Sequence, residues 1–124
     1  MARILIAEDE ESIRSLVARA LRQDGHEVVT ANDGAEALDV LVREKGAFEL
    51  LLTDIRMPVM DGIALALAAA RDHPDLTILL MTGYADQRER AHGLDALIHD
   101  VIAKPFSLTD IRKAVNGALV ARGR

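Results

Sequence analysis

Short, continuous apolar runs alternate with stretches of helical periodicity along the whole chain, and this alternation restricts the possible folds more than any other feature. The apolar residues of each run are consecutive rather than every second one, which is expected when a parallel sheet is covered on both faces. Such alternation predicts an α/β fold with a doubly wound, five-stranded parallel sheet. The predicted strands are Ile4–Ala7, Val28–Ala31, Leu50–Asp54, Ile78–Thr82 and Val101–Ala103.

Helical periodicity fills the gaps between these runs and predicts five helices. Four segments repeat apolar residues at the spacing of an amphipathic helix, namely 13–21, 37–42, 63–70 and 108–119. Ser107 is the expected N-cap of the last helix, with Asp110 three residues further on. The fifth helix, over Asp86–Gly93, has the weakest pattern because its residues are mostly polar. The tail at 121–124 is expected to be frayed.

The length and composition exclude several classes of protein. A chain of 124 residues suits one domain, so we expect a single domain over residues 1–124 with no output domain. The net charge of −5 and the aromatic content of 2% argue against a nucleic-acid partner. The absence of cysteine excludes disulfides and thiol catalysis. No segment is typical of a signal peptide or a membrane span, so we expect a cytoplasmic protein without a membrane partner.

Polar side chains follow four of the predicted strands at the point where each strand ends. Glu8 and Asp9 follow the first strand, and Asp54 ends the third. Thr82 ends the fourth strand, and Lys104 follows the fifth. Because right-handed crossovers place the loops after parallel strands on one edge, these groups should lie close together. Neighbouring carboxylates repel, so at least one of them should have a raised pKa unless a cation is present.

This set of side chains suits phosphoryl transfer onto an aspartate. Asp54 is the candidate nucleophile, since a carboxylate can accept a phosphoryl group. The loose transition state requires mostly positioning and charge neutralisation. The Lys104 ammonium and the Thr82 hydroxyl can supply these. Each of the two also has a simpler interpretation, Thr82 as a strand-end cap and Lys104 as a solvated lysine.

The acidic residues are also candidates for a magnesium site. Ligand sets made only of oxygen atoms favour Mg²⁺. We expect Asp9 and Asp54 to be direct ligands, Glu8 to act through water, and a backbone carbonyl, that of Arg56, to complete the shell. A solvated acidic loop at a helix N-terminus is the alternative for Glu8–Glu11 alone. The histidines lack the spacing of metal ligands and are interpreted as surface or rim residues: His26, His73, His92 and His99.

In combination, these motifs resemble the receiver domain of bacterial two-component response regulators over nearly the whole chain. The motifs are Glu8-Asp9, the segment Asp54–Gly62, Thr82 and Lys104-Pro105-Phe106. The resemblance implies strand order 2-1-3-4-5 with five helices. It implies that Asp54 is the phosphoacceptor, that Glu8 and Asp9 hold Mg²⁺, and that Thr82 and Lys104 sense the phosphoryl group. It also implies a histidine kinase or a histidine phosphotransfer protein as the phosphoryl donor.

One position departs from the family pattern. Many receivers carry an aromatic residue three positions before the lysine, and its inward movement reports phosphorylation. Here that position is Val101, and Tyr84 is the one aromatic residue near Thr82 in sequence. We therefore hypothesise that Tyr84 is the switch aromatic. The alternative is that Tyr84 is a rim residue that screens the site.

A narrower resemblance concerns regulated proteolysis. Residues 1–10 and 79–102 resemble a single-domain receiver that acts as an adaptor for the ClpXP protease in cell-cycle control. This implies that the unphosphorylated form is the active adaptor and that it contacts a ClpX-type unfoldase and its substrates. The expected contact surface lies on the fourth helix, fifth strand and fifth helix, with an exposed Val101 adding apolar area. Its expected members are Arg88, Arg90, His92, Val101 and Lys113.

Two other functions remain open. A phosphorelay shuttle would pass the phosphoryl group from Asp54 to another protein's histidine, and the sequence does not separate it from an adaptor. An aspartyl-phosphate phosphatase would need a general acid close to the nucleophile. Arg56, two residues after Asp54, cannot exchange protons near neutral pH. We therefore expect no enzyme activity beyond the domain's own phosphorylation and dephosphorylation, and a monomer or weak dimer.

Overall fold

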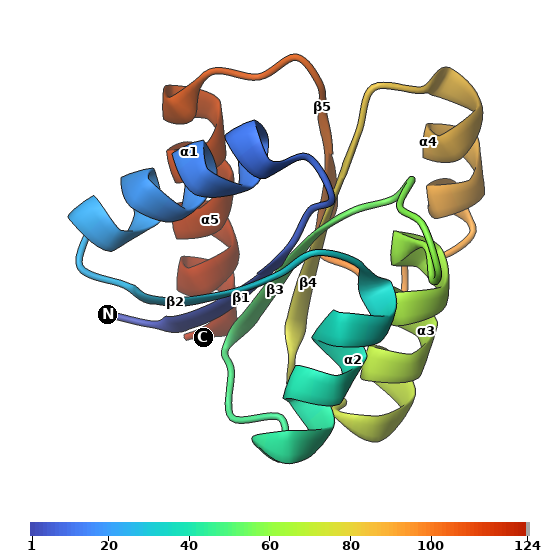
Figure 1. Ribbon diagram of the computed structural model, residues 1–124, viewed down its shortest axis with the longest axis horizontal. Coiled ribbons are helices and arrows are strands. Elements are labelled where there is room, and N and C mark those ends of the chain that lie inside the picture. Colours follow the sequence, from blue (N-terminus) through green and yellow to red (C-terminus); the bar gives the residue numbers. More distant parts are fainter. Residues whose placement is uncertain (124) are drawn as a thin grey trace.

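The computed structural model describes residues 1–123, in which strands and helices alternate strictly (Figure 1). The strands are β1 (Arg3–Ala7), β2 (Glu27–Ala31), β3 (Leu50–Asp54), β4 (Thr77–Thr82) and β5 (Asp100–Ala103). The helices are α1 (Glu11–Gln23), α2 (Gly34–Arg43), α3 (Gly62–Asp72), α4 (Ala85–His92) and α5 (Leu108–Arg122). All strands pair in parallel in the order β2-β1-β3-β4-β5. The predicted α/β class, strand order and number of helices are therefore confirmed.

The helices cover both faces of the sheet and divide the core in two (Figure 1). Helices α1 and α5 lie on one face, and α2, α3 and α4 lie on the other. Successive residues of a strand point to opposite faces. Ile4 and Ile6 therefore join the core under α1 and α5, whereas Leu5 and Ala7 join the core under α2, α3 and α4. Every residue of the central strand β3 is buried. This strand carries Asp54 at its end and is thus held from both sides.

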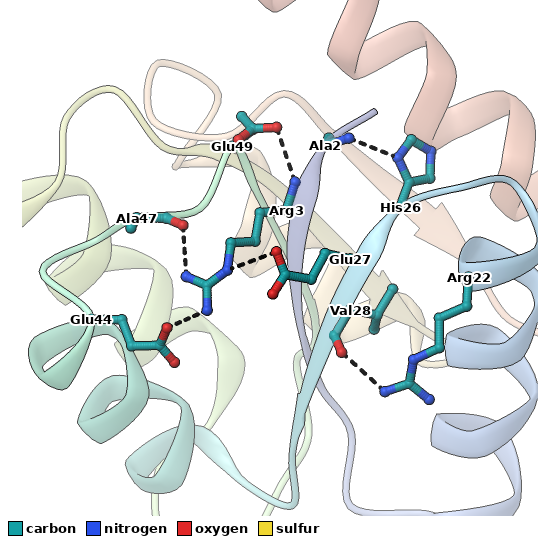
Figure 2. A network of polar contacts seen from close by, with 9 residues as sticks. All are labelled: Ala2, Arg3, Arg22, His26, Glu27, Val28, Glu44, Ala47 and Glu49. Carbon is teal, nitrogen blue, oxygen red and sulfur yellow. Dashed lines mark hydrogen bonds and ion pairs between the residues drawn. The ribbon is translucent and has the colours of Figure 1, made fainter.

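A cluster of polar contacts ties together the edge of the sheet at which the strands begin (Figure 2). The guanidinium of Arg3 donates to the Ala47 carbonyl at 2.9 Å and pairs with Glu27 at 3.3 Å and with Glu44. The backbone N–H of Arg3 donates to Glu49 at 2.9 Å. These contacts join β1 to β2 and to the loop before β3. The opposite edge, where the strands end, carries the predicted site.

Helix α4 is the least embedded of the helices. Among its residues only Ala91 is buried, in agreement with its weak apolar pattern.

Helix α5 differs from the prediction at its end, because it continues to Arg122. The Arg122 guanidinium contacts the Asp75 carbonyl and the Thr77 hydroxyl, so the expected fraying is wrong for Ala121 and Arg122. The prediction for the final residue lies outside the described part of the chain. None of the helices within residues 1–123 has the length and apolar content to cross a membrane.

Candidate functional site

The carboxyl ends of four strands bring the predicted polar groups to one edge of the sheet. The parallel register places Asp54 beside Met81 and Thr82 beside Ala103. The backbone N–H of Lys104 then donates to the Thr82 carbonyl at 2.9 Å, which extends the pairing of β4 and β5 by one step. Glu8 is anchored in the same way, since its N–H donates to the Ala31 carbonyl at 3.1 Å. Each side chain therefore leaves the sheet from a fixed backbone position.

Lys104 bridges two of the carboxylates. Its ammonium donates to Glu8 Oε1 at 2.7 Å and to Asp54 Oδ2 at 3.0 Å. Glu8 is fully buried, Asp54 is 8% exposed and Asp9 is exposed. One carboxylate oxygen from each of Glu8, Asp9 and Asp54 lies within 4.8 Å of the others. The structure therefore gathers three acids and one amine around a single small volume.

The electrostatics of this group are dominated by Glu8. Burial raises the pKa of Glu8 to about 8, contact with Asp54 adds to that rise, and the Lys104 ammonium opposes it. Burial also works against the charge of Lys104, but its contacts with Glu8 and Asp54 prevail and its pKa is raised. One of the neighbouring carboxylates thus has a raised pKa, as the sequence suggests.

The residues present fit a magnesium ion. Glu8 Oε2 is buried and has no hydrogen-bond partner within residues 1–123. Such an unpaired acceptor costs free energy unless a cation, or water held by a cation, lies against it. The cluster offers only oxygen atoms, which is the donor set that Mg²⁺ prefers. The role of the Arg56 carbonyl as a further ligand stays a prediction.

Thr82, Tyr84 and Arg56 form the side of the site next to β4. The Thr82 hydroxyl is buried and accepts a hydrogen bond from the backbone N–H of Tyr84 at 3.1 Å. The Tyr84 ring is 50% exposed, and the Arg56 guanidinium lies over it at 4.8 Å from the ring centroid. Tyr84 and Arg56 line an open cleft of about 910 Å³, together with Glu8, Asp9, Asp54 and Lys104. Tyr84 thus stands at the rim of the cleft, as expected for a residue that screens the site, and its role as the switch aromatic stays a prediction.

None of the residues of the expected contact surface lines this cleft, and one of them differs from the prediction. Arg88, Arg90, His92 and Lys113 are exposed, as expected. Val101 is not exposed but half-buried, because it packs against the core under α4. The expectation that Val101 adds exposed apolar area is therefore wrong.

Two residues that the sequence reasoning missed also shape the site. A Cβ atom at Gly62 would lie 2.0 Å from the Asp54 carbonyl oxygen, and the Gly62 N–H donates to the Ile55 carbonyl at 2.7 Å. The Asp-Gly pair at 61–62 is the signal in the sequence for this close approach. Arg14 donates to the backbone carbonyl of Glu8 at 2.9 Å. No sequence pattern predicts that contact, since it joins a helix to the loop before it.

Comparison with known proteins agrees with this geometry. The family model of the response regulator receiver domain matches residues 4–116. The response regulator receiver protein CpdR of Brucella abortus is 40% identical over 121 residues, which cover 98% of this chain and 99% of CpdR. The response regulator MprA of Mycobacterium leprae is 34% identical over 117 residues, which cover 94% of this chain and 50% of MprA.

Solved structures show the same fold. The response regulator TrrA of Thermotoga maritima, in complex with Mg(2+)-BeF, matches with a TM-score of 0.84 and 30% identity, covering 95% of this chain and 99% of TrrA. The parallel sheet with strand order β2-β1-β3-β4-β5 is thus shared with a protein of the same kind. The family match over residues 4–116 and the near full-length relative show that the chain belongs to the response regulator receiver domains.

Proposed function

We propose that this receiver domain is a phospho-accepting signalling switch, phosphorylated on Asp54 in the presence of Mg²⁺. The observation that carries the proposal is the position of the Lys104 ammonium, which touches both Asp54 and the buried Glu8. A cation held this close to an acceptor carboxylate suits a reaction in which charge on phosphoryl oxygens must be neutralised. The Mg(2+)-BeF complex of TrrA supports the same chemistry by analogy.

The reaction we propose transfers a phosphoryl group from a phosphohistidine on a histidine kinase or histidine phosphotransfer protein. An Asp54 carboxylate oxygen attacks the phosphorus, an O–P bond forms, and the P–N bond to the imidazole breaks. The leaving imidazole takes up a proton. Lys104 then pairs with a phosphoryl oxygen, and the Thr82 hydroxyl donates a hydrogen bond to another.

Mg²⁺ would be held by Asp9 and Asp54, with Glu8 acting through water and Arg56 offering its carbonyl. When bound, the ion neutralises charge on the phosphoryl oxygens and on the acids that surround them. Glu8, buried beside Lys104, keeps that lysine within reach of Asp54. Lys104 is thereby positioned before the phosphoryl group arrives.

We further propose that the switch controls regulated proteolysis in the cytoplasm, as a single receiver domain that acts as an adaptor for a ClpX-type unfoldase when unphosphorylated. Its support is the 40% identity to CpdR over nearly the full length of both proteins, together with the narrower resemblance of residues 1–10 and 79–102. The exposed cationic side chains of Arg88, Arg90 and Lys113 offer a polar contact surface. The domain would then act on its partner proteins through this surface.

Phosphorylation in vitro tests the central proposal. Incubation with a small phosphoryl donor and Mg²⁺ should add the mass of one phosphoryl group, labile to hydroxylamine as an acyl phosphate is. Asp54→Asn should abolish the added mass, while Asp39→Asn, which changes an exposed carboxylate on α2, should leave it intact. A phosphoryl group that still appears on Asp54→Asn would overturn the assignment. Steady turnover of generic phosphate esters would instead favour the phosphatase.

A further inference from the structure

A second cleft lies between α1 and the edge strand β2, separate from the cleft at Asp54. Its volume is about 480 Å³. Two neighbouring rows of α1, each spaced by four residues, form one wall, and β2 contributes Thr30. The rows are Arg14, Ala18 and Arg22, and Ser15, Arg19 and Gln23. No residue lines both this cleft and the one at Asp54.

The charge of this cleft is positive and uncompensated. Arg14, Arg19 and Arg22 line it, and no acidic side chain does. Within residues 1–123 these arginines form no ion pair, in contrast to the four arginines that pair with carboxylates: Arg3, Arg71, Arg90 and Arg112. Three guanidinium groups in one cleft repel each other, and they do so in a protein whose net charge is −5. An anion in the cleft would relieve that repulsion.

Two of the guanidinium groups are fixed without being neutralised. Arg14 donates to the Glu8 carbonyl at 2.9 Å. Arg22 donates to the Val28 carbonyl at 2.9 Å, as Figure 2 shows. A neutral carbonyl orients a guanidinium but leaves its charge intact, and each arginine keeps further N–H donors for a ligand. Ala18, between the two, is small and leaves room between the longer side chains. The cleft is thus arranged for anion recognition before a ligand binds.

We propose that this cleft binds a small organic molecule that carries several phosphate groups, of the size of a nucleoside triphosphate. The planar fork of a guanidinium matches the oxygens of a phosphate and can bind it through two hydrogen bonds. The volume lies in the range of small-molecule sites, roughly 300–1,000 Å³. No aromatic side chain lines the cleft, so recognition is of the phosphates and not of a base. The proposal does not depend on phosphorylation of Asp54.

A titration followed by backbone-amide NMR tests the proposal. Adenosine triphosphate is added to the full chain in buffer without divalent cations. Saturable shifts should concentrate in residues 14–23 and 28–30. Arg19→Gln should weaken binding about tenfold, the loss of one charged hydrogen-bonding group. Arg19 is exposed, and within residues 1–123 its side chain forms no hydrogen bond or ion pair, so this variant should keep its fold. Arg43→Gln, an exposed arginine of α2, should change binding by less than about twofold.

Other results would overturn the proposal. Equal weakening by Arg19→Gln and Arg43→Gln would mean unspecific attraction to surface charge. Shifts centred on the Asp54 cleft would place the anion there instead. An oligoglutamate peptide that binds residues 14–23 more tightly than adenosine triphosphate would make the cleft a docking site for an acidic protein segment. The absence of saturation at about 1 mM would exclude a specific site. Binding retained in Asp54→Asn would separate this result from the phosphoacceptor chemistry.

Discussion

Gly62 holds the loop after β3 against the carbonyl of Asp54 at a distance that allows no side chain. Its Cβ would meet that oxygen at 2.0 Å, with the backbone of Ile55 also within contact. Both neighbours are backbone atoms of a buried strand end, so neither can yield without moving Asp54 itself. We expect Gly62→Ala to lower the free energy of unfolding by about 3 kcal/mol. Urea unfolding would measure this change.

Gly117 offers the matched control for Gly62. It is exposed on α5, and a Cβ at this position would meet no atom within 4 Å. Gly117→Ala should therefore stabilise the protein by about 0.5–1 kcal/mol, since alanine loses less backbone freedom in a helix. If Gly62→Ala and Gly117→Ala had similar effects on unfolding, close approach at Gly62 would not be what makes glycine necessary there.

The switch hypothesis for Tyr84 rests on its connection to Thr82. The Tyr84 N–H is bonded to the Thr82 hydroxyl, so a hydroxyl that turns toward a phosphoryl group changes the backbone contact of Tyr84. Beryllofluoride mimics a phosphoryl group on Asp54. We predict that it shifts the amide resonances of α4 and β5 in the wild type and in Tyr84→Phe, but far less in Tyr84→Ala. Two-dimensional NMR would show it. If the resonances of α4 and β5 shifted in Tyr84→Ala as much as in the wild type, Tyr84 would be a rim residue that screens the site and not the switch aromatic.

At the scale of residues, the chain predicts which groups meet but not how tightly. Asp54, Thr82 and Lys104 follow apolar runs, and topology alone brings strand ends together. The close approach of Gly62 to the Asp54 carbonyl and the lack of a partner for the Glu8 Oε2 atom within residues 1–123 depend on the path of the loops, which no periodicity encodes. Such features require coordinates because they are set by distances of a few tenths of an ångström.

At the scale of elements, the apolar runs locate the strands to within one residue. Strand β3 has the predicted bounds, and the other four begin one residue earlier than predicted. The additional residues are polar: Arg3, Glu27, Thr77 and Asp100. They join the sheet through backbone pairing, as in the register Arg3–Glu27 and Leu50–Thr77. Hydrophobic patterning cannot detect a polar strand residue that joins the sheet through its backbone pairing. Hydrophobic patterning does not predict the end of α5 either, because the polar side chain of Arg122 holds it.

The start of α5 gives a prediction for pH. Ser107 and Asp110 form a capping box, in which the Asp110 N–H donates to Ser107 Oγ at 3.0 Å and the Ser107 N–H donates to Asp110 Oδ2 at 3.0 Å. The hydrogen bond from the Ser107 backbone N–H is the main cause that lowers the pKa of Asp110 below its ordinary value of 3.8, and the nearby Ser107 side chain lowers it further. The unfolded chain therefore takes up this proton first as the pH falls. The stability that ionised Asp110 contributes is present above that ordinary value and is lost as the pH falls through the folded pKa.

Asp110→Asn removes the titrating group and tests this assignment. At neutral pH the variant should be less stable than the wild type, because it loses the negative charge at the start of the helix. The difference in unfolding free energy should narrow as the pH falls below the ordinary aspartate range, at about 4. Urea unfolding at several pH values would measure it. A difference that stays constant with pH would show that the charge of Asp110 does not stabilise the cap.

At the scale of the whole molecule, the proposed switch would have to act against contacts that already exist. Shifting a two-state domain from mostly off to mostly on requires about 5.5 kcal/mol of preference for one state. That is comparable to the entire stability of a small domain, about 5–15 kcal/mol. In this structure Lys104 is bonded to Glu8 and Asp54. Under the proposed function, a phosphoryl group on Asp54 would have to offer Lys104 a better partner than these carboxylates, and a movement of Lys104 and Thr82 would then carry the change to β4 and β5.

The proposed adaptor role makes this balance measurable through a partner. We predict that a ClpX-type unfoldase binds the wild type at least about tenfold more weakly in the presence of Mg²⁺ and beryllofluoride than in their absence, since a phosphoryl mimic favours the other state. Asp54→Asn cannot hold the mimic and should bind equally well in both conditions. Asp39→Asn keeps the acceptor and should respond like the wild type. Surface-immobilised unfoldase would give the affinities directly. If the affinity for the unfoldase is unchanged by beryllofluoride, phosphorylation of the domain does not govern proteolysis. If only a histidine phosphotransfer protein binds and exchanges phosphate with Asp54, the domain is a relay shuttle.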